Sequence, residues 1–394
     1  MLYELIKPYS SVSLIGMCKN AGKTTVLNRL IKDCRRMDES IALTSIGRDG
    51  ERSDLVTNTK KPEIFVYDGT IIATAEKLLF AGGNLSDSGN DAQKNGMNSG
   101  ISREILDTTG MPTPMGEVII LRACSDGFIQ LAGPSMTAQL ARLKKRMFEL
   151  GAAKVIIDGA LSRKSLAMPA VSDAAILCSG ASYSPDIRKT VEDTCFSAEL
   201  MMLPQTERTE DVHQCKQKYG VFFGSGTHGG EQTEFSELSR AAELVRKGGA
   251  EAVLMRGGVP DSAANALIAA GHALNGLEII CEDGSRLLLS HKNYEKLVRA
   301  GARFTVMNKT RLLAVTVNPF SAKGSHYNKT EFYDAMCSGL GGRVPVLDVV
   351  SEFGCEAAEE TRARKIDTPA LSRINDRKQI DIIRLCLTNN SRQR

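Results

Sequence analysis

The sequence of 394 residues predicts an α/β protein with a mostly parallel sheet, followed by a second α/β domain. In the first half, short apolar runs alternate with amphipathic helical patterns, an order typical of βαβ units. A polar stretch without periodicity, residues 204–219, interrupts this alternation, which resumes beyond it. We therefore expect one domain over residues 1–205, a second over 220–352, and a charged C-terminal extension over 353–394.

The first domain is expected to open with a short buried strand and a helix. Three of the four residues 12–15 are apolar, and the following helix, residues 24–36, places Val26 and Leu30 on one face. Residues 82–100 are almost entirely Gly, Ser, Asn, Asp and other polar types, which predicts a flexible surface insertion. The expected strands cover residues 12–15, 41–46, 64–67, 118–122, 154–157 and 174–178, and the expected helices residues 24–36, 71–80, 137–150 and 185–200.

The second domain repeats the alternation. Residues 224–230 follow its first strand and match G-x-G-x-x-G, a pattern of dinucleotide-binding folds. No helix opens directly after them, and the next strand leads into Arg256 rather than an acidic residue for a ribose, so we favour a loop that lines a partner or ligand cleft. The expected strands are residues 219–223, 252–255, 277–281, 304–306, 313–317 and 344–349, and the expected helices 235–247, 261–273, 292–300 and 329–338.

Composition and charge exclude several classes of protein. Lys and Arg total 50 against 46 for Asp and Glu, a net charge of +4 that is too balanced for a nucleic-acid-binding protein. No apolar run reaches the roughly 18 residues of a membrane span. The 10 cysteines contain no C-x-x-C pair and are expected to be reduced thiols. We therefore expect a cytoplasmic protein without a nucleic-acid or membrane partner.

The strongest functional signal is residues 16–24, GMCKNAGKT, which match the pattern G-x-x-x-x-G-K-[ST] between an apolar strand and a helix. Backbone amides of such a loop surround phosphates, and the helix N-terminus adds partial positive charge. Lys23 is expected to reach the β- and γ-phosphates, and the Thr24 hydroxyl to bind Mg²⁺. The chain is thus predicted to be a P-loop NTPase. The expected nucleotide-binding residues of the loop are Gly16, Lys19, Asn20, Ala21, Gly22, Lys23, Thr24 and Thr25.

Two carboxylates are candidates for the metal and for catalysis. Asp158 comes at the end of an apolar run. In P-loop proteins the second metal ligand is also found at the end of a buried strand. Asp49 follows the next strand after the P-loop helix, a place from which it can orient a water molecule or hold Mg²⁺, and Arg48 beside it can neutralise phosphate charge. The alternative for residues 47–50 is a surface turn. Lys23, Asp49 and Asp158 are the expected catalytic residues, and Thr24, Asp49 and Asp158 the expected metal ligands.

The spelling of residues 19–25, KNAGKTT, resembles the P-loops of cofactor-biosynthesis NTPases such as dethiobiotin synthetase and the molybdopterin-guanine-dinucleotide accessory proteins. In the wider class of nitrogenase iron protein, a signature lysine lies five residues before the invariant one, and here that position is Cys18. Activation in trans by that lysine is therefore not implied, and a homo-oligomer stays an open alternative. Residues 308–311, NKTR, lack the aspartate of the guanine-specific N-K-x-D pattern, which favours ATP.

Over residues 1–352 the chain resembles the ATPase component of the reactivase for lysine 5,6-aminomutase, whose relatives accompany ornithine aminomutase. The resemblance rests on residues 16–25, 44–51, 60–62 and 69–75 and on the second α/β domain. It implies a chaperone-like use of ATP and Mg²⁺ to release damaged cobalamin from an adenosylcobalamin-dependent aminomutase of lysine fermentation. It also implies two partners, the aminomutase and a MutS-like ATPase subunit.

Two other functions stay open on the sequence alone. One is a ligase of the dethiobiotin synthetase type, in which ATP activates a small carboxylate. The other is a regulatory module that binds the nucleotide with little hydrolysis while its second domain recognises a partner. Turnover distinguishes the three, because a ligase requires its acid substrate, a reactivase requires its mutase, and a module requires neither.

Overall fold

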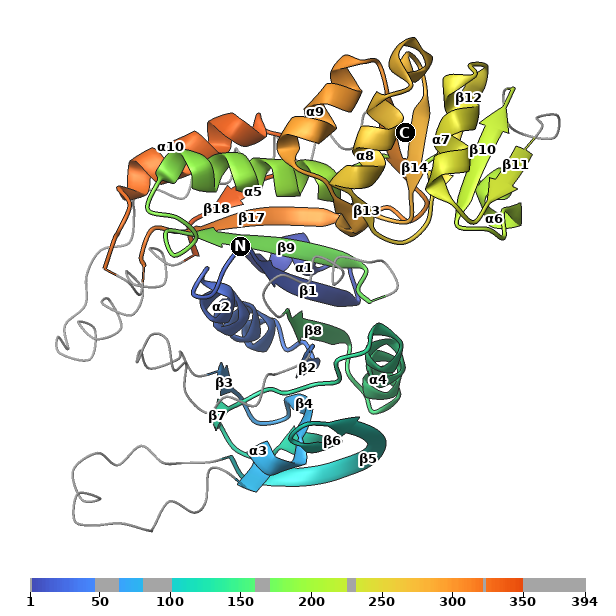
Figure 1. Ribbon diagram of the computed structural model, residues 1–394. Coiled ribbons are helices and arrows are strands. Elements are labelled where there is room, and N and C mark those ends of the chain that lie inside the picture. The colour runs from blue at the N-terminus through green and yellow to red at the C-terminus, as the bar shows by residue number, and fades with distance from the viewer. Residues whose placement is uncertain are drawn as a thin grey trace.

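A computed structural model describes residues 2–46, 64–80, 101–159, 171–224, 232–321 and 324–349, and its main feature is a nine-stranded sheet (Figure 1). The strands are β1 (Ser11–Gly16), β2 (Ile41–Ser45), β4 (Ile71–Ala75), β5 (Arg103–Thr113), β6 (Gly116–Ala123), β8 (Lys154–Asp158), β9 (Ala174–Gly180), β17 (Leu312–Asn318) and β18 (Val346–Leu347). Their order is β18-β17-β9-β1-β8-β2-β4-β6-β5. Neighbours from β18 to β4 run parallel, and β6 and β5 add an antiparallel hairpin at one edge. The expected α/β class with a mostly parallel sheet is confirmed.

Helices cover both faces of this large sheet (Figure 1). One face packs against α4 (Thr137–Glu149), α5 (Ile187–Met201) and α10 (Lys329–Leu340). The other packs against α1 (Leu2–Ile6), α2 (Lys23–Arg36) and α3 (Glu76–Phe80). All six residues of β1 are buried between β8 and β9, so the loop that follows β1 emerges from the interior of the sheet. Within the described part of the chain, no helix is long and apolar enough to cross a membrane.

The expected helix over residues 71–80 is wrong for its first half. Ile71–Ala75 form β4, whose five residues are all buried, and only Glu76–Phe80 are helical. The β-branched Ile71, Ile72 and Thr74 suit a strand, and β4 pairs with β2 on one side and β6 on the other. The remaining expected elements of the first half occur with ends within two residues of those predicted, whereas residues 82–100 lie outside the described residues.

Strand β5 is one that the sequence does not predict. Of its eleven residues only Met111 is buried, so the segment lacks the apolar alternation by which a strand is recognised. It is held by its antiparallel pairing with β6. Two short strands, β3 (Ile64–Val66) and β7 (Gly127–Ile129), form a separate antiparallel pair.

After α5 the chain leaves the large sheet and forms a second sheet of five strands, ordered β11-β10-β12-β14-β16. Its strands are β10 (Tyr219–Phe223), β11 (Gln232–Phe235), β12 (Ala250–Met255), β14 (Glu278–Cys281) and β16 (Arg303–Val306). Its helices are α6 (Thr209–Gln214), α7 (Leu238–Arg246), α8 (Asp261–Ile268) and α9 (His291–Arg299). The strands β12, β14 and β16 are parallel, whereas β10 is antiparallel to both of its neighbours.

The last two strands expected in the second domain lie in the large sheet instead. β17 pairs in parallel with β9, and β18 pairs with β17. Placing residues 313–317 and 344–349 in the second domain is therefore wrong. An apolar run predicts a buried strand but does not specify which sheet the strand joins. The expected C-terminal extension, residues 353–394, lies outside the described residues.

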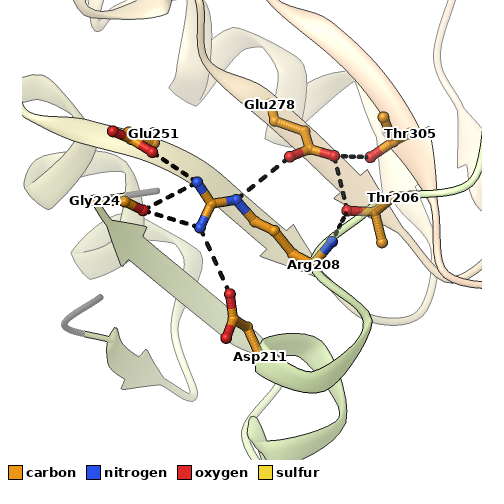
Figure 2. A network of polar contacts seen from close by, with 7 residues as sticks. All are labelled: Thr206, Arg208, Asp211, Gly224, Glu251, Glu278 and Thr305. Carbon is orange, nitrogen blue, oxygen red and sulfur yellow. Dashed lines mark hydrogen bonds and ion pairs between the residues drawn. The ribbon is translucent and has the colours of Figure 1, made fainter. Parts of the chain in front are cut away.

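Arg208 fixes the segment that leads into the second sheet (Figure 2). Its Nη2 donates to Glu251 Oε2 at 2.7 Å, and its Nε lies 3.6 Å from Glu278 Oε2. Because Glu251 and Glu278 lie at the amino ends of β12 and β14, Arg208 holds the segment that leads into the second sheet against that edge of the sheet. The other contacts are Arg208 to the Gly224 carbonyl and Asp211, and the Thr206 and Thr305 hydroxyls to Glu278.

Candidate nucleotide-binding site

The predicted P-loop, residues 16–24, leads from buried β1 into α2 at the carboxyl edge of the large sheet. Two of its residues have positive φ angles, 61° at Asn20 and 93° at Gly22. Gly22 is the N-cap residue of α2 and, as a glycine, has no side chain to cap the helix. The first amides of a 14-residue helix are therefore left to bind another acceptor, the arrangement by which helix N-termini bind anions.

Lys23 folds back over the start of the loop. A Cβ atom placed on Gly16 would lie 2.7 Å from Lys23 Nζ and 3.1 Å from Lys23 Cδ. The same Cβ position lies 3.2 Å from the Cys18 carbonyl oxygen. A side chain at residue 16 would therefore displace the ammonium, and glycine is required if Lys23 is to keep this position.

Asp158 ends β8, the neighbour of β1, at the same carboxyl edge of the sheet as the loop. In the sheet register Asp158 is opposite Leu14, and the Gly159 amide donates to the Leu14 carbonyl at 2.9 Å. Burial raises the pKa of Cys178 to about 11, while the Lys23 ammonium lowers the pKa of this thiol and the Asp158 carboxylate raises it. Lys23 and Asp158 thus both influence the pKa of one buried thiol, and both belong to the carboxyl edge of the sheet.

Two further strands end against the P-loop. A Cβ atom on Gly180, the last residue of β9, would lie 3.0 Å from the Asn318 carbonyl oxygen and 3.3 Å from Ala21 Cα. Asn318, the last residue of β17, donates from Nδ2 to the Asn20 carbonyl oxygen at 2.9 Å. The central part of the loop is therefore packed on the carboxyl ends of β9 and β17.

The other predicted site residues are distributed as follows. Thr24 and Thr25 are half-buried in the first turn of α2, Ala21 is buried, and Lys19 is exposed on the loop. Arg48 and Asp49 lie outside the described residues, so their roles stay predictions. Among the residues that the structure describes, no group of three or more His, Cys, Asp and Glu side chains could hold a metal ion.

Three residues at this edge were not singled out from the sequence: Cys178, Asn318 and Gly133. The Gly133 amide donates to Ser45 Oγ at 3.1 Å, and a Cβ atom on Gly133 would lie 1.8 Å from the Ser45 carbonyl oxygen. The segment after β7 therefore packs against the end of β2 with no room for a side chain at residue 133. The Gly133-Pro134 dipeptide is a signal for a turn, but no local pattern indicates which strand the turn crosses.

The second glycine-rich pattern does not have the context of a dinucleotide fingerprint. The strands on either side of it, β10 and β11, are antiparallel, so this loop closes a hairpin and does not lead from a strand into a crossover helix. Arg256 Nη2 donates to the carbonyl oxygens of Val212 and Cys215 at 2.8 and 2.9 Å, and so holds the chain around α6. The loop residues 225–231 themselves lie outside the described residues.

No family model, curated protein or solved structure matches this chain. What the site can do therefore follows from its own residues: a lysine ammonium, an uncapped helix N-terminus and a neighbouring carboxylate at one edge of a parallel sheet.

Proposed function

We propose that this protein binds ATP together with Mg²⁺ at the P-loop and hydrolyses it. The observation that carries the proposal is the position of the Lys23 ammonium against Gly16, at the start of a loop that ends in an uncapped helix. A lysine ammonium and the positive end of a helix dipole together supply the potential that β- and γ-phosphates require.

Each residue has a defined task in this proposal. Lys23 neutralises the β- and γ-phosphate oxygens and stabilises the charge that grows there during phosphoryl transfer. The Thr24 hydroxyl, in the first turn of α2, and the Asp158 carboxylate, at the end of β8, would hold Mg²⁺ along with phosphate oxygens. Asp49 would position the attacking water and Arg48 would neutralise phosphate charge. ATP is favoured over GTP because residues 308–311 lack the aspartate that recognises guanine.

The first test replaces Lys23. Because charge-assisted hydrogen bonds contribute about 1.5–3 kcal/mol each, we expect Lys23→Ala to raise the Kd of Mg-ATP about 100-fold in calorimetry and to abolish phosphate release. Lys32→Ala is the control, since this residue is on the same helix but about 13 Å farther along its axis. Unchanged Kd and turnover in Lys23→Ala would contradict the proposal.

The second test separates the two carboxylates. Asp158→Asn should weaken only the Mg²⁺-dependent part of ATP binding, because the ligand charge is lost. Its control is Asp173→Asn, since Asp173 Oδ2 accepts the Ser11 amide at the opposite edge of the sheet. Asp49→Asn should bind Mg-ATP normally but hydrolyse it slowly. Hydrolysis at the wild-type rate in Asp49→Asn would return residues 47–50 to the surface-turn interpretation.

We further propose that the ATPase acts in the cytoplasm as part of a reactivase for an adenosylcobalamin-dependent aminomutase such as lysine 5,6-aminomutase. The support is the resemblance of residues 1–352 to the ATPase component of such reactivases. Damaged cobalamin stays bound while the mutase is closed. An ATPase whose nucleotide cycle changes its relative affinity for the open and the closed mutase can favour the open state. A MutS-like ATPase would be the second component.

The test of this role begins with a mutase inactivated by substrate or hydroxocobalamin. This protein, the MutS-like ATPase, Mg-ATP and fresh adenosylcobalamin are then added. Recovered activity that disappears without ATP, or with Lys23→Ala, would support the reactivase. Activity that stays lost, together with ATP consumption that depends on a small carboxylate, would identify a ligase instead. Binding of ATP with neither response would identify a regulatory module.

A further inference from the structure

One amide side chain links the P-loop to the segment that follows β17. Asn318 Nδ2 donates to the Asn20 carbonyl oxygen at 2.9 Å, and Asn318 Oδ1 accepts the Phe320 amide at 3.1 Å. Asn318 is 9% exposed, so this side chain has little access to solvent. Its hydrogen bonds therefore connect two loops that are far apart in the sequence.

The residue that Asn318 holds has an uncommon backbone conformation. Asn20 has a φ angle of 61°, in the left-handed region that residues other than glycine adopt at a cost. The orientation of the Asn20 carbonyl also sets the orientation of the Ala21 amide, because both belong to one planar peptide group. A donor fixed to the Asn20 carbonyl therefore aims an amide of the loop.

Asn318 is itself held by the neighbouring strand β9. The Ala181 amide donates to the Asn318 carbonyl oxygen at 2.9 Å, and Asn318 is opposite Gly180 in the parallel pairing of β17 with β9. A Cβ atom on Gly180 would lie 3.1 Å from Asn318 Cβ, so the two strand ends are in close contact. The Asn318 side chain is thus held from the sheet side while it holds the loop.

We propose that Asn318 is a positioning residue of the P-loop, which holds the Asn20 peptide so that the loop amides face the phosphates before the nucleotide arrives. This inference rests on the proposed binding of ATP. Pre-organisation of this kind lowers the cost of ordering the loop on binding. Because the restraint acts equally on substrate and product complexes, its loss should raise the Kd values of Mg-ATP and Mg-ADP by the same factor and leave kcat at saturating ATP unchanged.

The experiment uses the full chain and two variants of Asn318. Asn318→Ala removes both hydrogen bonds, whereas Asn318→Asp keeps the shape and an acceptor for the Phe320 amide but cannot donate to Asn20. The matched control is Asn293→Ala in helix α9, because Asn293 is also 9% exposed and its Nδ2 also donates one hydrogen bond of 2.9 Å, to Asp261. Amide hydrogen exchange is measured without nucleotide, and Kd values for Mg-ATP and Mg-ADP by calorimetry.

We expect the amides of residues 17–22 to exchange faster in both Asn318 variants than in wild type or Asn293→Ala, with exchange in β8 unchanged. The Kd values of Mg-ATP and Mg-ADP should each rise about fivefold, the effect of one hydrogen bond, while kcat stays within about twofold. If Asn318→Asp exchanges and binds like wild type, the contact with Phe320 is the important one and the inference is overturned. Exchange of residues 17–22 that equals wild type in both variants would overturn it as well. If wild type does not bind Mg-ATP, the proposed function fails, but the exchange result still decides whether Asn318 positions the loop.

Discussion

Replacing Gly16 by alanine tests whether the Lys23 ammonium works from the position in which the structure holds it. The new Cβ would lie 2.7 Å from Lys23 Nζ, whereas non-bonded heavy atoms prefer about 3.5–4.0 Å. Since Nζ is the end of a flexible side chain, the lysine can move away, and we expect the fold to lose about 1 kcal/mol, the lower end for overpacking. The displaced ammonium should cost about 1.5–3 kcal/mol of nucleotide affinity, which corresponds to a Kd for Mg-ATP about 10- to 150-fold higher.

Calorimetry measures the Kd and thermal denaturation measures the stability of the same samples. Gly258→Ala is the matched control, since a Cβ there would meet only Leu288 Cδ1, at 3.3 Å, far from the P-loop. In a Lys23→Ala background, Gly16→Ala should cause no further loss of affinity, because the displaced group is already absent. Wild-type affinity in Gly16→Ala, combined with weak binding in Lys23→Ala, would refute the reasoning: the ammonium would then bind phosphate from another position.

Two further predictions concern stability. Arg208→Ala leaves Glu278, whose side chain is 12% exposed, without its cation, and should lower the free energy of unfolding in urea by about 2 kcal/mol. Arg240→Ala, which breaks a pair with both side chains more than 60% exposed, should change that free energy by less than about 0.5 kcal/mol, and equal effects of the two variants would contradict the prediction. Burial raises the pKa of Cys178 to about 11 from an ordinary 9, so the folded state holds this proton more tightly than the unfolded state. The contribution of this thiol to stability is complete below about pH 9 and is lost between about pH 9 and 11. In Cys178→Ala the thermal midpoint should therefore fall less over that range than in wild type. An equal fall in the two proteins would contradict the prediction.

The strand, loop and helix around residues 16–24 could be predicted from the sequence because the pattern that indicates them is local. The glycines, the lysine and the flanking apolar runs adjoin one another, and the ends of β1 and α2 differ from the predicted ends by at most one residue. Asp158 was also predictable, since a carboxylate that ends an apolar run comes to the carboxyl edge of a parallel sheet. Ile71–Ala75 was not, because a short apolar run fits a helix or a strand until its neighbours are known.

The contacts made by distant segments could not be predicted. Asn318 and Asn20 are 298 positions apart, and the hydrogen bond between them exists because β17 pairs with β9. Likewise, the close approach of Gly133 to Ser45 depends on where the segment after β7 crosses the sheet. Sequence patterns report burial and local geometry, whereas strand order is set by how the whole sheet is assembled.

The return of β17 to the large sheet changes the meaning of the polar stretch 204–219. The chain leaves the large sheet at that stretch, but the large sheet is not yet complete there. Its last two strands, β17 and β18, follow the second sheet in the sequence. Gly180 ends β9, the last strand of the large sheet before the second sheet in the sequence, and Asn318 ends β17, the first strand after it. Both residues contact the loop at residues 20–21. A shift of β17 against β9 must therefore alter the Asn318 hydrogen bond to the loop. The two contacts that hold residues 20–21 of the loop are thus made by the same strands between which the second unit is inserted.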